Sequence, residues 1–231
     1  MLGKRYFAEI RRLLDEVEET QAEKMQKAAD LLAERIMSGN RLFIFGCSHA
    51  AMLAEEMVYR AGGLVLMNPI FGPGLALTER PVSRTSKLER LEGYARIVLE
   101  SSPLEPGDVL IVVSTSGRNA VPIEMAMEAK RMGATVIALT SLGYANAISS
   151  RHKSGKKLHD VADLVLDNRG IAGDAILEVE GMKQRICGTS YVVGAVMLHS
   201  IVAEVVERLL EKGVEPPVLT SGNLDGGMDA N

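Results

Sequence analysis

The chain has few cysteines, no long apolar run and no strong excess of either charge. Its 231 residues include two cysteines, Cys47 and Cys187, which are too few for a disulfide framework or a cysteine-rich zinc site. The formal net charge is −4, whereas general nucleic-acid-binding proteins carry a basic excess. We therefore expect neither a disulfide-stabilised secreted domain nor a nucleic-acid partner.

Neither a membrane span nor a secretion signal is expected. The most apolar stretch, 191–206, is interrupted by His199 and Glu204 and is short for a helix that crosses a bilayer. The first residues lack the apolar core of a signal peptide and become charged quickly. We interpret the apolar stretch as a buried helix, and we expect no membrane partner and a reducing, cytoplasmic location.

Hydrophobic patterning predicts an α/β fold. Short runs that are apolar at consecutive positions indicate strands covered on both faces, as in a parallel sheet. They lie at 41–45, 64–67, 108–113, 134–139 and 162–167. Helical spacing of apolar residues is found at 4–37, 50–60, 87–100, 120–132 and 188–212. This alternation predicts a three-layer sandwich in which helices flank a five-stranded parallel sheet.

The chain shows no internal repeat and no linker, so we expect a single domain, 1–231. Within it we distinguish an N-terminal helical segment (1–38), the α/β core (39–212) and a polar, glycine-rich tail (213–231). The last part of this tail, 220–231, is the small, polar and glycine-rich stretch, and we expect it to be flexible or to fold over a neighbouring site.

Two connections are longer than a strand-to-helix turn requires, at 68–86 and 141–159. Both leave from carboxyl ends of predicted strands, where open α/β sheets bind their ligands. The second is basic: it contains Arg151, His152, Lys153, Lys156 and Lys157. Two interpretations stay open at this point, a cationic lid over an anionic ligand and a solvated basic surface.

A motif rich in hydroxyl groups follows the third predicted strand. Ser114, Thr115 and Ser116 precede Gly117, and a helix is predicted from about Ala120. Free backbone N–H groups and the helix dipole favour an anion at such a position, and Gly117 allows close approach of the backbone. Asn119 is the expected N-cap. Because simple capping does not require consecutive hydroxyl residues, we favour phosphate binding.

The stretch "VVSTSGRNAVPIEMA" resembles the phosphosugar-binding signature S-x-S-G-x-[TS] of SIS (sugar isomerase) domains. The resemblance covers roughly residues 30–210. The stretches "SKLERLEGYA" and "SSRHKSGKKL" are similar to a subgroup of single-domain SIS proteins, whose nearest well-understood relatives are phosphoheptose isomerases. The resemblance implies that Ser114, Thr115, Ser116 and Asn119 contact a phosphate, with Asn119 in the place of the usual Thr or Ser.

The first loop departs from the family pattern. Many SIS domains have the pattern G-x-G-x-S after the first strand. In this chain the three fixed positions of the pattern are occupied by Gly46, Ser48 and Ala50. We expect Ser48 to supply the sugar-binding hydroxyl, with an altered loop geometry. The carboxylate base of phosphoheptose isomerases lies about two turns past this loop, an offset that meets Tyr59. Glu55 and Glu56 precede it on the same predicted helix and are the candidate bases or, alternatively, surface charges.

Histidines are the candidate proton donors. His49 stands at the start of a predicted helix beside the first loop, and His199 lies on the last predicted helix, where phosphoheptose isomerases place a functional histidine. Cys47 is expected to be a small buried thiol. His49, His199 and Glu55 could surround a zinc ion, but no spacing such as H-E-x-x-H supports this, so we expect no metal and no other cofactor.

The leading functional hypothesis is a sugar-phosphate isomerase that uses general acid and base proton transfer. The alternatives are a lyase or etherase acting on a phosphorylated amino sugar, and a non-catalytic phosphosugar sensor such as the SIS domains of some transcriptional regulators. We also expect at least a dimer, because the last predicted helix is apolar around nearly its whole circumference. The resemblance to SIS domains implies a homodimer or a homotetramer.

Overall fold

A five-stranded parallel sheet forms the centre of the computed structural model, which describes all 231 residues. In spatial order its strands are β2 (Met67–Ile70), β1 (Leu42–Gly46), β3 (Val109–Val113), β4 (Thr135–Thr140) and β5 (Leu164–Asp167). All of the pairings between neighbouring strands are parallel. The predicted α/β fold and its parallel sheet are therefore confirmed.

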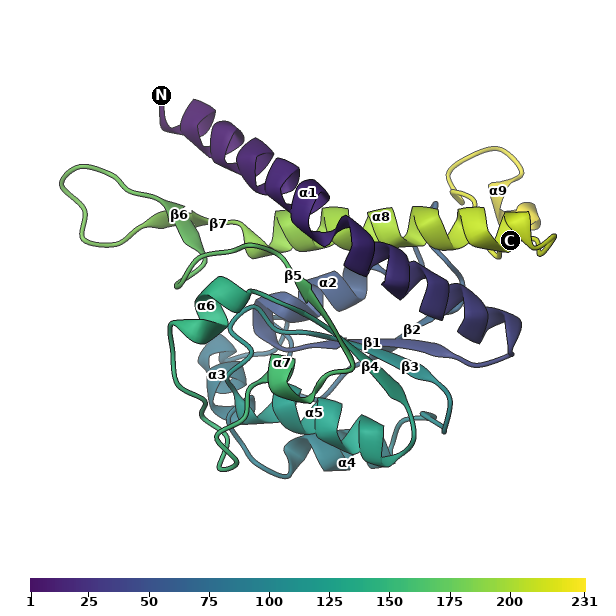
Figure 1. Cartoon of the computed structure of the whole chain (residues 1–231), viewed down its shortest axis with the longest axis horizontal. Coiled ribbons are helices and arrows are strands. Elements are labelled where there is room, and N and C mark those ends of the chain that lie inside the picture. Colours follow the sequence, from purple (N-terminus) through teal and green to yellow (C-terminus); the bar gives the residue numbers. More distant parts are fainter.

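Helices cover both faces of this sheet (Figure 1). They are α1 (Leu2–Met37), α2 (Ala51–Glu56), α3 (Thr85–Leu88), α4 (Tyr94–Glu100), α5 (Ala120–Arg131), α6 (Leu142–Asn146), α7 (Leu158–Val161), α8 (Ser190–Glu211) and α9 (Gly227–Ala230). Short 3₁₀ turns add η1 (Ser48–Ala50) and η2 (Val82–Arg84). The helices α1 and α8 cross one face of the sheet, and α4 and α5 pack side by side below the other.

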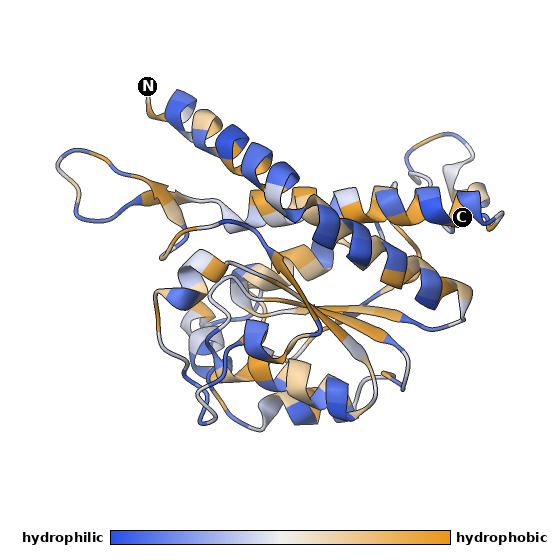
Figure 2. Cartoon of the chain, viewed as in Figure 1, coloured by the Kyte–Doolittle hydropathy of each residue, from blue (hydrophilic) through white to orange (hydrophobic).

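Alternation along the strands divides the core into two layers. Leu42 and Ile44 of β1 belong to the apolar cluster beneath α1 and α8. Phe43 and Phe45 point to the opposite face of the sheet and belong to the cluster between the sheet and helices α4 and α5. Figure 2 shows the strands as the most continuous hydrophobic part of the ribbon. Because the strands are buried on both faces, their sequences are unbroken apolar runs.

Several predicted elements have different bounds in the structure. The helix expected at 87–100 is divided into α3 and α4 because Gly93 adopts a left-handed conformation, with φ of 83°. The second strand was expected at 64–67 and is instead Met67–Ile70. Leu64 forms an antiparallel bridge with Val218.

The C-terminal tail is held against the body of the protein. The Leu219 N–H donates to the Gly63 carbonyl (3.0 Å), and the Gly62 N–H donates to the Leu219 carbonyl (2.8 Å). These bonds complete the bridge between Leu64 and Val218. The start of the tail therefore lies against the segment that follows α2.

A hairpin formed by β6 (Ala175–Leu177) and β7 (Ile186–Gly188) was not predicted. Strands this short carry too little alternation for a sequence pattern. The hairpin and the N-terminal half of α1 extend beyond the sheet on the same side (Figure 1). No helix of the structure is long and apolar enough to cross a membrane.

Candidate functional site

A cavity of about 330 Å³ opens at the carboxyl ends of β1 and β3. The chain runs from β1 to β2 on one side and places β3 on the other, which makes this the position where open α/β sheets bind ligands. The lining comes from the loops after β1 and β3, from Glu89 and from the segment 141–159. The lining residues are Cys47, Ser48, His49, Ala50, Glu89, Ser114, Thr115, Ser116, Arg118, Asn119, Tyr144 and Arg151.

The loop between β3 and α5 presents free donors to this cavity. The backbone N–H groups of residues 115–120 donate no hydrogen bond within the protein, and the Ser114, Thr115 and Ser116 hydroxyls also lack protein partners. The loop is fixed from behind, because the Thr115 carbonyl accepts from the Ser141 N–H (3.0 Å) and the Thr140 hydroxyl (3.2 Å). Exposed N–H groups in a curved loop at a helix N-terminus form an anion-binding concavity.

Two residues give this loop its shape. Gly117 has φ of 58°, and a Cβ there would lie 3.1 Å from Thr140 Oγ1, so the position favours glycine. Asn119 is the N-cap of α5, as predicted, but its side chain makes no capping bond. Its Oδ1 instead accepts from Arg151 Nη1 at 3.0 Å. The first turn of α5 is therefore left without the side-chain acceptor that a cap would supply.

The loop after β1 is conformationally restricted at Gly46 and at Ser48. A Cβ on Gly46 would lie 2.3 Å from the Ala50 carbonyl oxygen, so only glycine fits without backbone movement. Ser48 has φ of 56°, a left-handed conformation that glycine adopts more readily. The Ser48 N–H donates to the Leu75 carbonyl (2.6 Å). This bond compensates part of the strain and leaves the Ser48 hydroxyl and the exposed His49 ring at the cavity.

Glu89 is the carboxylate that the structure brings to the cavity. Burial raises the pKa of Glu89. A side-chain hydrogen bond from Asn119 and the positive charges of Arg90 and Arg151 oppose part of this increase. Glu89 lies within the family-like stretch "SKLERLEGYA", but no local sequence pattern distinguishes it as a site residue. Its position follows from packing, since the Glu89 carbonyl accepts the Val121 N–H of α5 at 3.0 Å.

Cys47 lies beside this carboxylate and is buried, as predicted. Burial and the negative charge of Glu89 raise the pKa of its thiol well above the usual value. A neutral thiol is a poor nucleophile. Cys47 therefore lines the cavity as a neutral thiol and does not act as a nucleophile.

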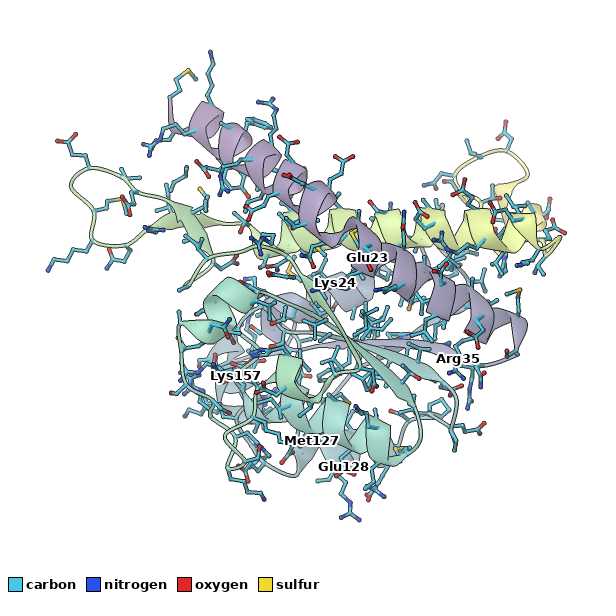
Figure 3. All side chains as sticks on the ribbon, in the orientation of Figure 1. Glu23, Lys24, Arg35, Met127, Glu128 and Lys157 are labelled. Carbon is cyan, nitrogen blue, oxygen red and sulfur yellow. The ribbon has the colours of Figure 1, made fainter.

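Arginines provide the positive charge of the cavity. Arg151 was predicted from the basic segment, whereas Arg118 and Tyr144 were not selected from the sequence. Arg118 Nη2 donates weakly to Ser149 Oγ (3.4 Å), and its buried Nε has no partner. Lys157, labelled in Figure 3, donates to the Ala145 carbonyl (2.6 Å) and so ties the basic segment to α6, which carries Tyr144.

His152 and Lys153 do not line the cavity, although they flank Arg151. His152 is buried, with Nδ1 2.7 Å from Ser154 Oγ and Nε2 3.4 Å from Glu124 Oε1. The Lys153 N–H and ammonium both bind Glu92. Ligand atoms of Glu92, Glu124 and His152 lie within 4.8 Å of one another and could share a metal ion. Each of these side chains already has a protein partner, so bonds within the protein explain the cluster.

Glu55, Glu56 and His199 are not among the residues that line this cavity. The helix α2 ends at Glu56, and Tyr59 is an exposed left-handed residue beyond it. Glu56 pairs with Arg60 and lies 3.0 Å from His199 Nε2, while Glu55 faces solvent. Burial, followed by the charge of Arg60, lowers the pKa of His199. Glu56, Arg60 and His199 form a separate polar cluster between α2 and α8.

The chain is similar in sequence and in fold to known proteins. A family model described as "SIS domain" matches residues 5–141. A UPF0309 protein of Shouchella clausii is 50% identical over 222 residues, which is 96% of this chain and 90% of the relative. The phosphoheptose isomerase of Neisseria gonorrhoeae superposes with a TM-score of 0.54 at 21% identity, covering 90% of this chain and 100% of that one. A phosphoheptose isomerase of Francisella tularensis gives 0.57 at 16% identity, covering 88% and 96%.

Proposed function

Because the chain belongs to the SIS family of phosphosugar-binding domains and, within it, to the UPF0309 proteins, we propose that it isomerises a sugar phosphate. The cavity at the ends of β1 and β3 is the reaction site. One observation carries this proposal: the N–H groups of residues 115–120 and the adjoining hydroxyls of Ser114, Thr115 and Ser116 have no acceptor or partner within the protein. Unused donors that converge at a helix N-terminus match the terminal oxygens of a phosphate ester.

The phosphate binds in the loop between β3 and α5. The loop supplies backbone N–H groups and hydroxyls, and the positive end of the α5 dipole adds a favourable field. Binding at this point anchors one end of the sugar, so that the carbon chain extends along the cavity toward Ser48, His49 and Glu89. Such anchoring replaces a bimolecular encounter with a positioned reaction.

Glu89 acts as the general base in this proposal. An aldose–ketose conversion removes a proton from the carbon next to the carbonyl, forms an enediol and returns a proton to the neighbouring carbon, so that no oxidant or reductant is needed. Burial raises the pKa of Glu89 and thereby increases its basicity toward the weakly acidic C–H group. His49, exposed at the opposite loop, is the proposed donor to the sugar oxygens, and Ser48 holds the sugar through its hydroxyl.

Proton exchange at carbon tests this function directly. The protein is incubated in D₂O with aldose and ketose phosphates, including amino-sugar and heptose phosphates, and the C1 and C2 protons are followed by NMR. An isomerase gives exchange together with the interconverted sugar. Exchange with loss of a substituent identifies the lyase or etherase alternative, whereas thermal stabilisation by a sugar phosphate without exchange identifies the sensor alternative.

Ser116→Ala tests the phosphate position under each of these functions. The variant is expected to lose the thermal stabilisation that a sugar phosphate confers on the wild type. Ser101→Ala is the matched control, because the Ser101 hydroxyl binds only the Ile97 carbonyl of its own helix. Equal ligand-induced shifts in Ser116→Ala and the wild type would exclude phosphate binding at this loop.

A further inference from the structure

Three neighbouring arginines beside the cavity have no ion-pair partner. Arg118 and Arg151 line the cavity, and Arg90 follows directly after Glu89. No carboxylate lies within salt-bridge distance of any of the three. Most other arginines of the chain do have such a partner, for example Arg41, Arg169 and Arg208. Arginines gathered without an anion indicate a cationic surface that is incomplete in the free protein.

The individual contacts support this interpretation. Arg151 uses Nη1 on the neutral Asn119 side chain, and Arg118 makes one weak bond to the neutral Ser149 hydroxyl. The buried Nε of Arg118 has no acceptor, and an orphaned buried donor requires an explanation, such as an absent ion. Burial, followed by the positive charges of Arg118 and Arg90, lowers the pKa of Arg151. Arg118 and Arg90 therefore both repel Arg151.

The phosphate position does not account for Arg90 and Arg151, which lie outside the loop between β3 and α5. The loop between β3 and α5 already offers backbone N–H groups and hydroxyls to a phosphate. Arg151 binds the Asn119 side chain, which also contacts Glu89. Its guanidinium is therefore close to the proposed base and hence to the reacting part of the sugar. The only carboxylate lining the cavity is Glu89 itself, so one negative charge stands against three guanidinium groups.

The geometry points to a second acidic group on the ligand: Arg90, Arg118 and Arg151 bind a carboxylate or a second phosphate of a phosphorylated sugar. This inference rests on the proposed function, because the first phosphate must occupy the loop between β3 and α5. It narrows the substrate class from sugar phosphates in general to those that carry another anionic substituent. Guanidinium groups suit this role because they bind carboxylate and phosphate oxygens with paired N–H donors.

Matched ligand pairs test the inference by calorimetry. N-acetylmuramic acid 6-phosphate is compared with N-acetylglucosamine 6-phosphate, which lacks the carboxylate, and glucose 1,6-bisphosphate with glucose 6-phosphate. A charge-assisted contact of about 1.5–3 kcal/mol corresponds to roughly tenfold or more in affinity. We expect at least this preference for the more acidic member of one pair. The pair that shows it distinguishes a carboxylate from a phosphate as the second group.

Arginine variants assign the preference to these residues. Arg151→Gln and Arg90→Gln are expected to bring both members of the responsive pair to similar affinity while retaining monophosphate binding. Arg90 makes no side-chain hydrogen bond within the protein, so its variant isolates charge from folding. Arg131→Gln is the control, because Arg131 pairs with Glu128 at the far end of α5. The preference should also weaken as salt is raised.

The outcomes separate this inference from the proposed function. Binding of the monophosphates without any preference within either pair overturns the second acidic subsite and leaves the phosphate site standing. Equal loss of affinity for both members in Arg151→Gln also overturns it, because the arginine then serves the first phosphate. If no sugar phosphate binds the wild type, both proposals fail.

Discussion

Glu89 illustrates how a single side chain acquires chemical character from its surroundings. It follows a solvent-exposed stretch of sequence, yet packing against the start of α5 partly buries it and raises its pKa. Asn119 links it to Arg151, so that base, amide and guanidinium form one chain across the cavity. A carboxylate placed in this way is suited to accept a proton, because its ionised form is poorly solvated.

Glu89→Gln is expected to reduce proton exchange by about 10²–10⁴-fold, because the amide cannot accept the proton. Binding of the sugar phosphate should persist, since the loop between β3 and α5 is unchanged. D₂O exchange by NMR measures the first effect and calorimetry the second. Glu55→Gln and Glu56→Gln are the matched variants on α2. If one of them loses exchange while Glu89→Gln keeps it, the base belongs to the α2 cluster and the assignment of Glu89 is wrong.

The raised pKa of Glu89 also predicts a pH-dependent stability difference. The folded protein holds the proton of Glu89 more tightly than the unfolded chain, so this group destabilises the fold progressively as pH rises from the ordinary value of about 4.3 through the raised pKa. The melting temperature of Glu89→Gln relative to the wild type should therefore increase from pH 4 to pH 8. A constant or decreasing difference over this range would contradict the raised pKa.

Gly46→Ala tests the close approach in the loop after β1. The new Cβ would meet the backbone of Ala50, which cannot move without shifting η1, so we expect a loss of roughly 1–3 kcal/mol in unfolding free energy. Gly3→Ala is the control, because nothing lies within 4 Å of a Cβ there, and alanine favours helix α1 by up to about 1 kcal/mol. Denaturant unfolding of both variants measures the contrast, and equal stabilities would refute the steric explanation.

At the scale of elements, the start of α5 was the best predicted part of the site. The strand, the hydroxyl-rich turn and the N-cap are adjacent in sequence, so local rules suffice to place them. The helix after β1 was predicted less well. It was expected to reach residue 60, but α2 ends at Glu56, and Tyr59 turns into a left-handed conformation. The tail bonds that follow at Gly62 and Gly63 lie too far along the chain for local patterning to anticipate.

A polar cluster joins α1 to the edge of the sheet. Arg169 binds Glu16 of α1 (2.6 Å) and the buried Asp167 at the end of β5 (3.0 Å). Asp167 also accepts the Leu142 N–H that begins α6 (3.0 Å). Since α6 carries Tyr144 to the cavity, this cluster supports one wall of the candidate site from a distance.

Arg169→Gln is accordingly expected to lower the unfolding free energy by about 1–3 kcal/mol, because the buried Asp167 loses a charged partner. The matched control is Arg12→Gln, which removes an exposed partner of the same Glu16 and should change stability by less than about 1 kcal/mol. Denaturant unfolding compares the two variants. Similar effects would show that burial of Asp167 does not distinguish the pairs.

At the scale of the whole molecule, the surface formed by α1 and α8 remains partly uncovered. A groove of about 440 Å³ between these helices includes Leu14, Val17, Met25, Val196 and Met197. Val196 is 42% exposed, and Phe7 on the protruding half of α1 is 63% exposed. Exposed apolar residues gathered on adjacent helices are typical of an interface, which keeps the expectation of a homodimer or homotetramer.

Sedimentation at micromolar concentration is therefore expected to show at least a dimer, and Val196→Glu should shift it toward the 24.9 kDa monomer. Burying an unpaired carboxylate in an apolar interface is unfavourable. Ile97→Glu is the control, because Ile97 is also exposed but lies on α4 below the other face of the sheet. A wild-type monomer, or equal behaviour of the two variants, would contradict this interface.

The sequence by itself determined the alternation of strands and helices, the parallel sheet and the hydroxyl-rich turn before α5. Each of these depends on residues close together in the chain, whose periodicity and capping preferences act locally. Only the tertiary structure decided which side chains share the cavity. Glu89 and Arg118 line it, whereas Glu56 and His199 contact each other between α2 and α8 and Glu55 faces solvent. That choice depends on long-range packing, because helix ends and side-chain burial are set by segments distant in sequence.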